Sequence, residues 1–205
     1  MVWLNVGTRT VPAIQRPTIS PGTKEAREHS PYNRYRYSGR KDYKEPYCGL
    51  FLECGLGKSV STLTAIKQLK DWAFIDKTLI IAPKKVAQVT WKDEINNWER
   101  LKGLRISVID GTAAQRRAAM MADADIYTVS RDNVVWLVVE HGGVKLPYDM
   151  VVIDELSSFK NYASKRFKAL RRVRKFIPRV VGLTGTPAPN GLIDLWAQMF
   201  FISCM

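Results

Sequence analysis

From Tyr47 onward, short apolar segments alternate with longer stretches whose apolar residues recur at helical spacing. The short segments predict six strands: Gly49–Leu52, Thr78–Ala82, Arg105–Ile109, Asp125–Val129, Met150–Ile153 and Val180–Leu183. The longer stretches predict helices near 58–70, 85–99, 112–121, 131–140, 163–176 and 191–202. This alternation is typical of βαβ units, and strands that are apolar on consecutive residues should be covered on both faces. The pattern therefore predicts an α/β fold with a doubly wound, mostly parallel sheet.

Residues 1–47 show no steady period. Five prolines and three glycines interrupt every window that is long enough for a helix. We therefore predict two parts, a poorly ordered basic N-terminal segment over 1–47 and a globular domain over 48–205.

Composition narrows the class of protein. Hydrophobic residues make up 46% of the chain and charged residues 25%, which excludes a wholly disordered or fibrous chain. No run approaches the roughly 18 apolar residues that span a membrane, so no membrane partner is expected. The three cysteines form neither a C-x-x-C pair nor an even set, and the N-terminus lacks a signal-peptide layout. These features predict a cytoplasmic protein.

The net charge of +13 is unevenly distributed. Residues 1–47 carry +5, residues 48–155 carry none, and residues 156–193 carry nine basic side chains with no acidic one. Two basic segments around a neutral core predict a polyanionic partner. The alternative is a solvated basic face without a partner. Within the second segment, helical spacing predicts that Phe167, Leu170, Arg174 and Ile177 pack on the sheet.

A glycine-rich loop follows the first predicted strand and precedes a helix. Such a loop lets backbone N–H groups converge on a phosphate at the helix N-terminus. Lys58 would reach the β- and γ-phosphates and Ser59 would bind Mg²⁺, although Leu52 stands where the full motif has glycine. We predict nucleotide contacts from Gly55, Leu56, Gly57, Lys58, Ser59 and Val60.

Two further candidates also stand at strand ends. Asp154 and Glu155 follow the fifth predicted strand, where carboxylates can hold Mg²⁺ and polarise an attacking water. The alternative is an acidic pair at the start of a helix. The run Thr184-Gly185-Thr186-Pro187 follows the sixth predicted strand. Its hydroxyls could serve a neighbouring carboxylate or phosphate, or the run could be a polar turn.

Together these residues resemble a known family. The stretches Gly55–Ser59, Asp154–Ser157 and Thr184–Pro187 are similar to motifs I, II and III of superfamily-two helicases, and more narrowly of the Swi/Snf-type translocases with their phage and bacterial relatives. Leu79–Pro83 with Trp91 and Trp98 is similar to motif Ia and its helix. The resemblance covers about 48–202. Motif II ends in Leu156-Ser157, where the family more often has Ala-His or Ala-Asp.

The resemblance implies a function and a set of partners. It implies the first RecA-like lobe of an ATP-dependent translocase that uses ATP and Mg²⁺ on nucleic acid, DNA rather than RNA, in a bacterial or phage-infected cell. Lys58, Asp154 and Glu155 would be catalytic, Ser59 and Asp154 would hold the metal, and Thr184, Gly185 and Thr186 would couple the site to movement. Asn33 is the nearest candidate for reading adenine.

Two other functions stay open. A second RecA-like lobe, which carries the family's arginine finger, has no counterpart in these 205 residues. The first alternative is therefore a non-catalytic, nucleotide-gated nucleic-acid-binding module from a truncated or split gene. The second is a small-molecule P-loop kinase, against which the Thr-Gly-Thr-Pro run argues. The five tryptophans after residue 47 are expected to pack in the core or at interfaces, rather than to stack on bases.

Overall fold

A computed structural model describes residues 2–4, 46–53, 55–186 and 192–203. Asn33 and most of the 1–47 segment lie outside the described residues, as do Cys54 in the glycine loop and Pro187. Within the described part, no helix is long and apolar enough to cross a membrane.

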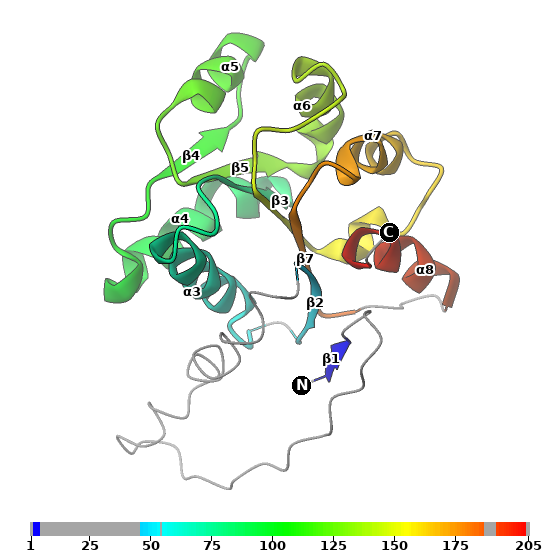
Figure 1. Ribbon diagram of the computed structural model, residues 1–205, viewed down its shortest axis with the longest axis horizontal. Helices are drawn as coiled ribbons and strands as arrows, with labels where there is room; N and C mark the ends of the chain where they lie inside the picture. Colours follow the sequence, from blue (N-terminus) through cyan, green and yellow to red (C-terminus); the bar gives the residue numbers. More distant parts are fainter. Residues whose placement is uncertain (1, 5–45, 54, 187–191, 204–205) are drawn as a thin grey trace, which may run out of the picture.

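A single twisted sheet forms the centre of the molecule (Figure 1). Its strands lie in the order β1-β2-β7-β6-β3-β5-β4. Six of them run parallel and correspond to the six predicted strands: β2 (Tyr47–Phe51), β3 (Thr78–Ala82), β4 (Ile106–Ile109), β5 (Ile126–Ser130), β6 (Met150–Asp154) and β7 (Arg179–Thr184). Strand β1 (Val2–Leu4) pairs antiparallel with β2 at one edge. The predicted α/β fold is confirmed.

Helices cover both faces of the sheet (Figure 1). Helices α3 (Lys58–Asp71) and α4 (Trp91–Asn97) pack on one face, and α6 (Val134–Glu140), α7 (Lys165–Arg174) and α8 (Leu192–Ile202) pack on the other. Helix α5 (Ala113–Met121) lies beside the edge strand β4. In β3, Leu79 and Ile81 belong to the α6–α8 core, whereas Ile80 and Ala82 belong to the α3–α4 core. This two-sided burial explains why the strand is apolar on consecutive residues.

Two of the predicted helices are interrupted. The helix expected over 85–99 consists of a π-helical turn at Val86–Thr90, then α4, then a 3₁₀ turn at Glu99–Leu101. The buried hydroxyl of Thr128 on β5 donates to the Ala87 carbonyl at 2.7 Å. Irregular helical turns often occur where a side chain inserts into the backbone hydrogen-bond ladder. The helix expected over 131–140 begins with a 3₁₀ turn at Arg131–Asn133 before α6.

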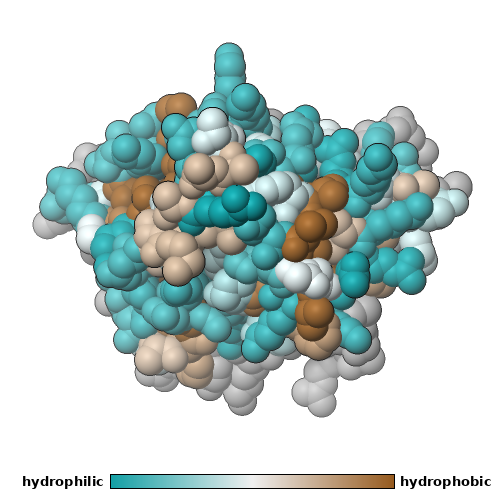
Figure 2. Space-filling view, turned by 90° about the horizontal axis from the view of Figure 1, so that it is seen from above, coloured by the Kyte–Doolittle hydropathy of each residue, from teal (hydrophilic) through white to brown (hydrophobic). Residues whose placement is uncertain are grey.

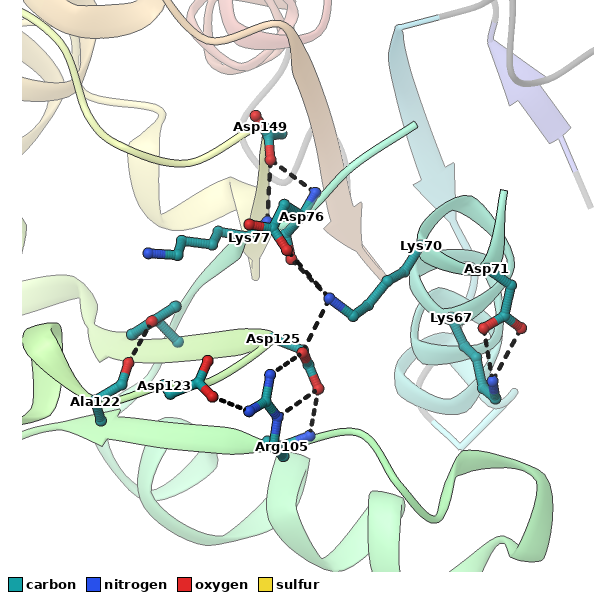
Figure 3. Close-up of polar contacts among 11 residues, drawn as sticks. Lys67, Lys70, Asp71, Asp76, Lys77, Arg105, Ala122, Asp123, Asp125 and Asp149 are labelled. Carbon is teal, nitrogen blue, oxygen red and sulfur yellow. Dashed lines mark hydrogen bonds and ion pairs between the residues drawn. The ribbon is translucent and has the colours of Figure 1, made fainter. Parts of the chain in front are cut away.

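The amino edge of the sheet is occupied by an ion-pair network (Figure 3). Asp125 accepts from Arg105 Nη2 and pairs with Lys70 Nζ, each at 3.0 Å. Burial by itself raises the pKa of Asp125, but the bonds from Arg105 and Lys70 lower it to about 2. Asp149 accepts from the backbone N–H groups of Asp76 and Lys77 at 2.8 and 3.0 Å. The charges of these carboxylates are balanced by contacts within the fold.

The surface is mostly hydrophilic, with apolar side chains in small separate groups (Figure 2). The prediction for α7 is confirmed, because Phe167, Leu170, Arg174 and Ile177 are all buried. Of the tryptophans expected to pack in the core or at interfaces, Trp91 is fully buried in the core. Trp196 is 64% exposed and Trp72 is also exposed, so neither lies in the core, and for both the packing at an interface stays a prediction.

Candidate functional site

The sheet order brings the three sequence motifs to one edge. Strand β7 lies between β2 and β6, and all three are parallel, so their carboxyl ends meet. Phe51 pairs with Thr184, and Leu183 pairs with Asp154. The Leu52 N–H also donates to the Thr184 carbonyl at 3.2 Å. In parallel sheets ligands bind beyond the carboxyl ends of the strands, so this edge is the candidate site.

The loop after β2 has a backbone that depends on its glycines. Gly55 and Gly57 have φ angles of +82° and +74°, a region that side chains disfavour. Gly57 is the N-cap of α3, no side chain caps this helix, and its first turn carries no acidic residue. Its first N–H groups, which have no partners within the helix, are therefore suited to an anion. The Leu56 side chain points to solvent and that of Val60 is buried, so both would contact a nucleotide through the backbone.

Lys58 folds back over the loop that precedes it. Its ammonium group donates to the carbonyls of Leu52 at 2.7 Å and Glu53 at 3.0 Å. Leu52 is only 7% exposed and packs in the α3–α4 core, so its backbone carbonyl, and not its side chain, faces the lysine. This arrangement explains how the loop accepts leucine where the full motif has glycine.

Asp154 ends β6 in a surrounding that favours its neutral form. Burial raises the pKa of Asp154 to about 6, and the neighbouring charge of Glu155 adds to the rise. A polar interaction with the Trp91 side chain and the positive charge of Lys58 oppose it. The indole Nε1 of Trp91 is buried and forms no well-aligned hydrogen bond within the described part of the chain, so its interaction with Asp154 is a loose polar contact. A carboxyl group perturbed in this way at a strand end is a mark of a functional site.

Glu155 has a left-handed backbone, with a φ of +57°, which is unusual for a residue other than glycine. Two hydroxyl groups donate to the same carboxylate oxygen, Oε1. Ser157 donates from the next turn of chain, and Thr184 donates from the end of β7 at 3.4 Å. The Thr184 hydroxyl in turn accepts from the backbone N–H of Thr186 at 3.1 Å. Side chains of motifs II and III are therefore linked directly.

The predicted residues are not all connected to the same degree. Lys58, Asp154, Glu155 and Thr184 are linked by hydrogen bonds or by charge. Ser59 lies in the first turn of α3, and its role as a metal ligand stays a prediction, as does the coupling role of Gly185. No group of three or more His, Cys, Asp or Glu in the described residues could hold a metal ion by itself. A carboxylate and a hydroxyl beside a phosphate loop nevertheless fit Mg²⁺, which is usually bound by one or two carboxylates plus substrate phosphates.

Two contacts of this site are not predictable from the sequence. The spacing of Trp91 indicates only packing, yet its side chain interacts with Asp154. Ser157 stands out in the sequence only as a departure from the usual motif II, yet its hydroxyl bonds to Glu155. Neither contact follows from spacing, because the left-handed turn at Glu155 and the approach of α4 to β6 are set by packing.

The sheet order and the loop after β2 define a P-loop domain of the RecA type. Residues 38–205 match the model of the SNF2-related domain, and the chain belongs to that family. The Swi/Snf resemblance inferred from the motifs is thereby confirmed.

Relatives and solved structures agree with this assignment. Over 155 residues, the chain is 40% identical to putative protein p41 of Acyrthosiphon pisum secondary endosymbiont phage 1, covering 72% of this chain and 34% of that protein. It is 29% identical to helicase SWR1 of Mycosarcoma maydis, covering 73% of this chain and 8% of that protein. The SWI2/SNF2 ATPase core of Sulfolobus solfataricus in complex with dsDNA superposes with a TM-score of 0.71 at 24% identity, covering 84% of this chain and 35% of that one. The chain thus spans about a third of the phage protein's length.

Proposed function

We propose that this chain is the ATP-binding lobe of an ATP-dependent DNA translocase. The observation that carries the proposal is the meeting of the three motifs on the neighbouring strands β2, β7 and β6, with Thr184 bonded to Glu155. Membership of the SNF2-related family supports ATP as the nucleotide. The similar ATPase core of Sulfolobus solfataricus forms a complex with dsDNA, which supports DNA as the partner.

Each residue has a defined task in this proposal. Lys58 exchanges its two loop carbonyls for phosphate oxygens, a move that replaces neutral acceptors with charged ones. Ser59 and Asp154 would hold Mg²⁺, which would neutralise charge at the phosphates when bound. Glu155, kept in place by Ser157 and Thr184, orients and polarises the attacking water.

The proposal includes a partner lobe and a location. Phosphoryl transfer needs a cation opposite Lys58, and the family's second RecA-like lobe would supply it as an arginine finger. We infer that movement on DNA depends on closure of such a lobe over the carboxyl edge of this sheet, in the cytoplasm of a bacterial or phage-infected cell.

Calorimetric titration with Mg-ADP and with a non-hydrolysable Mg-ATP analogue tests the nucleotide site. Binding that needs both Mg²⁺ and Lys58 is the expected result. A phosphate-release assay with a second RecA-like lobe and duplex DNA then tests turnover. Nucleotide binding without any DNA-stimulated release would favour the non-catalytic, nucleotide-gated module.

A further inference from the structure

Helix α7 presents a basic face. Its exposed cations are Lys165, Lys168, Arg171, Arg172 and, at the helix end, Lys175. None of the five forms an ion pair with a carboxylate in the described part of the chain, whereas Arg166 on the same helix lies 3.8 Å from Asp132. The sequence itself has no acidic residue from 156 to 193. This concentration of one charge is unfavourable unless an anion offsets it.

An aromatic hollow adjoins this basic face. It has a volume of about 220 Å³ and is lined by Tyr162, Phe167, Arg171, Trp196 and Phe200. The rings of Tyr162 and Trp196 are 61% and 64% exposed, and they stand perpendicular to each other at a centroid distance of 6.4 Å. Arg171 lies 5.8 Å from the centroid of the Phe200 ring and so belongs to both the hollow and the basic face.

The chemistry of this surface selects among possible occupants. Two large aromatic rings in water favour a flat apolar ligand, and a row of cations favours phosphates. A single strand of nucleic acid offers both, because its unpaired bases stack on aromatic rings while its backbone follows a basic groove. An acidic protein segment would neutralise the cations, but the carboxylates that make it acidic do not stack on aromatic rings. A second copy of the chain would bring like charges together.

We propose that α7 and the Tyr162–Trp196 hollow bind single-stranded nucleic acid. The proposal adds a second contact surface to the nucleic-acid partner of the proposed function, and it rests on that function. Lys168, Arg171 and Lys175 recur at helical spacing over seven residue steps, or about 10 Å, so they can follow consecutive phosphates. Tyr162 and Trp196 then receive a base beside the contact made by Arg171, which lines the same hollow.

The surface lies close to the elements of the candidate active site but on the other face of the sheet from the phosphate loop. Tyr162 is reached from the segment after β6, and α8 follows β7. Helices α7 and α8 pack on the sheet face opposite α3, the helix that begins at the phosphate loop (Figure 1). A strand held here would therefore leave the loop after β2 free for nucleotide.

Fluorescence anisotropy with a labelled 20-nucleotide single strand tests the proposal. We expect Tyr162→Ala with Trp196→Ala to weaken binding at least tenfold, since stacking contributes about 1–3 kcal/mol per base. Lys168→Gln with Arg171→Gln and Lys175→Gln should lower the slope of log affinity against log salt by about 2. The matched control removes three exposed lysines elsewhere, Lys92, Lys102 and Lys145, and should leave affinity within about twofold.

Further binding measurements test the other possible occupants of this surface. Single strands of DNA and of RNA share the proposed chemistry, and comparing them assigns the source. Equal binding of duplex and single strand, with no effect of the aromatic variants, would overturn the proposal and leave an electrostatic face alone. So would preferential binding of a poly-glutamate peptide, or a sedimentation shift showing that this face joins two copies of the chain.

One variant distinguishes this proposal from the proposed function. Lys58→Ala should weaken nucleotide binding and leave single-strand binding unchanged, because Lys58 lies at the other site. If neither the wild type nor any variant bound nucleotide, the proposed ATP site would be contradicted, but the proposal for the α7 surface would still stand. Circular dichroism melting curves of all variants establish that each is folded.

Discussion

The hydroxyl of Thr184 donates to the Glu155 carboxylate at 3.4 Å and thereby joins the end of β7 to the residue that follows β6. The Ser157 hydroxyl bonds to the same carboxylate oxygen. Because Glu155 has a strained backbone and two anchored contacts, its carboxylate has little freedom. A group meant to orient water benefits from such restriction.

Turnover by these 205 residues alone should be very slow, even with DNA present. The chain supplies groups for the metal, the phosphates and the water, but in related phosphoryl transfer an arginine finger contributes about 10³–10⁵ in rate. Adding a separately expressed second lobe should restore phosphate release. In that mixture, Glu155→Gln should abolish release and spare nucleotide binding. Brisk DNA-stimulated hydrolysis by the isolated chain, lost on Lys58→Ala, would show that the missing cation is not limiting.

Removing the Thr184 hydroxyl should lower turnover in the same mixture. Thr184→Val keeps the side-chain volume but leaves Glu155 with one anchoring hydroxyl, and a hydrogen bond to a charged group contributes about 1.5–3 kcal/mol. We expect phosphate release to fall about 10- to 100-fold, with nucleotide affinity unchanged. Thr64→Val, which removes a hydroxyl bonded to the Val60 carbonyl of its own helix, is the control. Equal rates in the two variants would contradict the coupling role.

Lys58→Ala should weaken Mg-nucleotide binding about 10- to 150-fold. The substitution removes a charge-assisted contact to phosphate that contributes about 1.5–3 kcal/mol. Titration calorimetry measures the effect. Lys67→Ala removes a lysine of the same helix that pairs with Asp71 at 2.9 Å on the surface, and it should bind like the wild type. Wild-type affinity in Lys58→Ala would rule out the phosphate site.

Asp154→Asn should stabilise the fold at pH 8 and not at pH 4. The pKa of Asp154 is raised to about 6 by burial, so the folded state binds this proton more tightly than the unfolded chain does. Stability therefore falls as pH rises from about 4 to 6, and the loss persists above that range. Removing the charge should raise the free energy of unfolding by about 1–3 kcal/mol at pH 8, as urea denaturation will measure.

The control substitution should change the stability in the opposite direction. Asp149→Asn removes the charge of a carboxylate that accepts from two backbone N–H groups, so it should destabilise the protein at pH 8. A gain from Asp154→Asn that is equal at both pH values would show that burial of the charge is not its cause. Asp154→Asn should also abolish nucleotide turnover, because residues at functional sites often favour activity at the expense of stability.

Ala73→Gly should stabilise the end of α3. Ala73 has a φ of +58° and closes the helix, with its N–H donating to the Lys70 carbonyl at 2.8 Å. Glycine adopts this left-handed conformation without the roughly 1–2 kcal/mol that a side chain adds. Glycine also has more conformational entropy in the unfolded chain, which offsets part of this gain. We therefore expect the free energy of unfolding to rise by about 0.5–1 kcal/mol. Thermal unfolding measures it, and a lower midpoint than the wild type would contradict a strained alanine at this position.

Much of the site was predictable because its signals are local. Gly55 and Gly57 stand where the backbone needs positive φ, and Lys58 begins the helix that follows, so the loop could be read from consecutive residues. The interrupted helix around Val86–Thr90 was not predictable, because this turn contacts the Thr128 hydroxyl of a strand about 40 residues away, which local periodicity does not record.

The sequence by itself determined the six parallel strands, the helices that cover them and the three motifs at strand ends, because apolar period and turn chemistry act over a few residues. Only the tertiary structure decided that β7 lies between β2 and β6, and hence that Thr184 meets Glu155. It alone placed Trp91 beside Asp154 and left Trp196 exposed next to Arg171. Strand order and helix docking depend on contacts between residues far apart in the chain, and no short window of sequence records them.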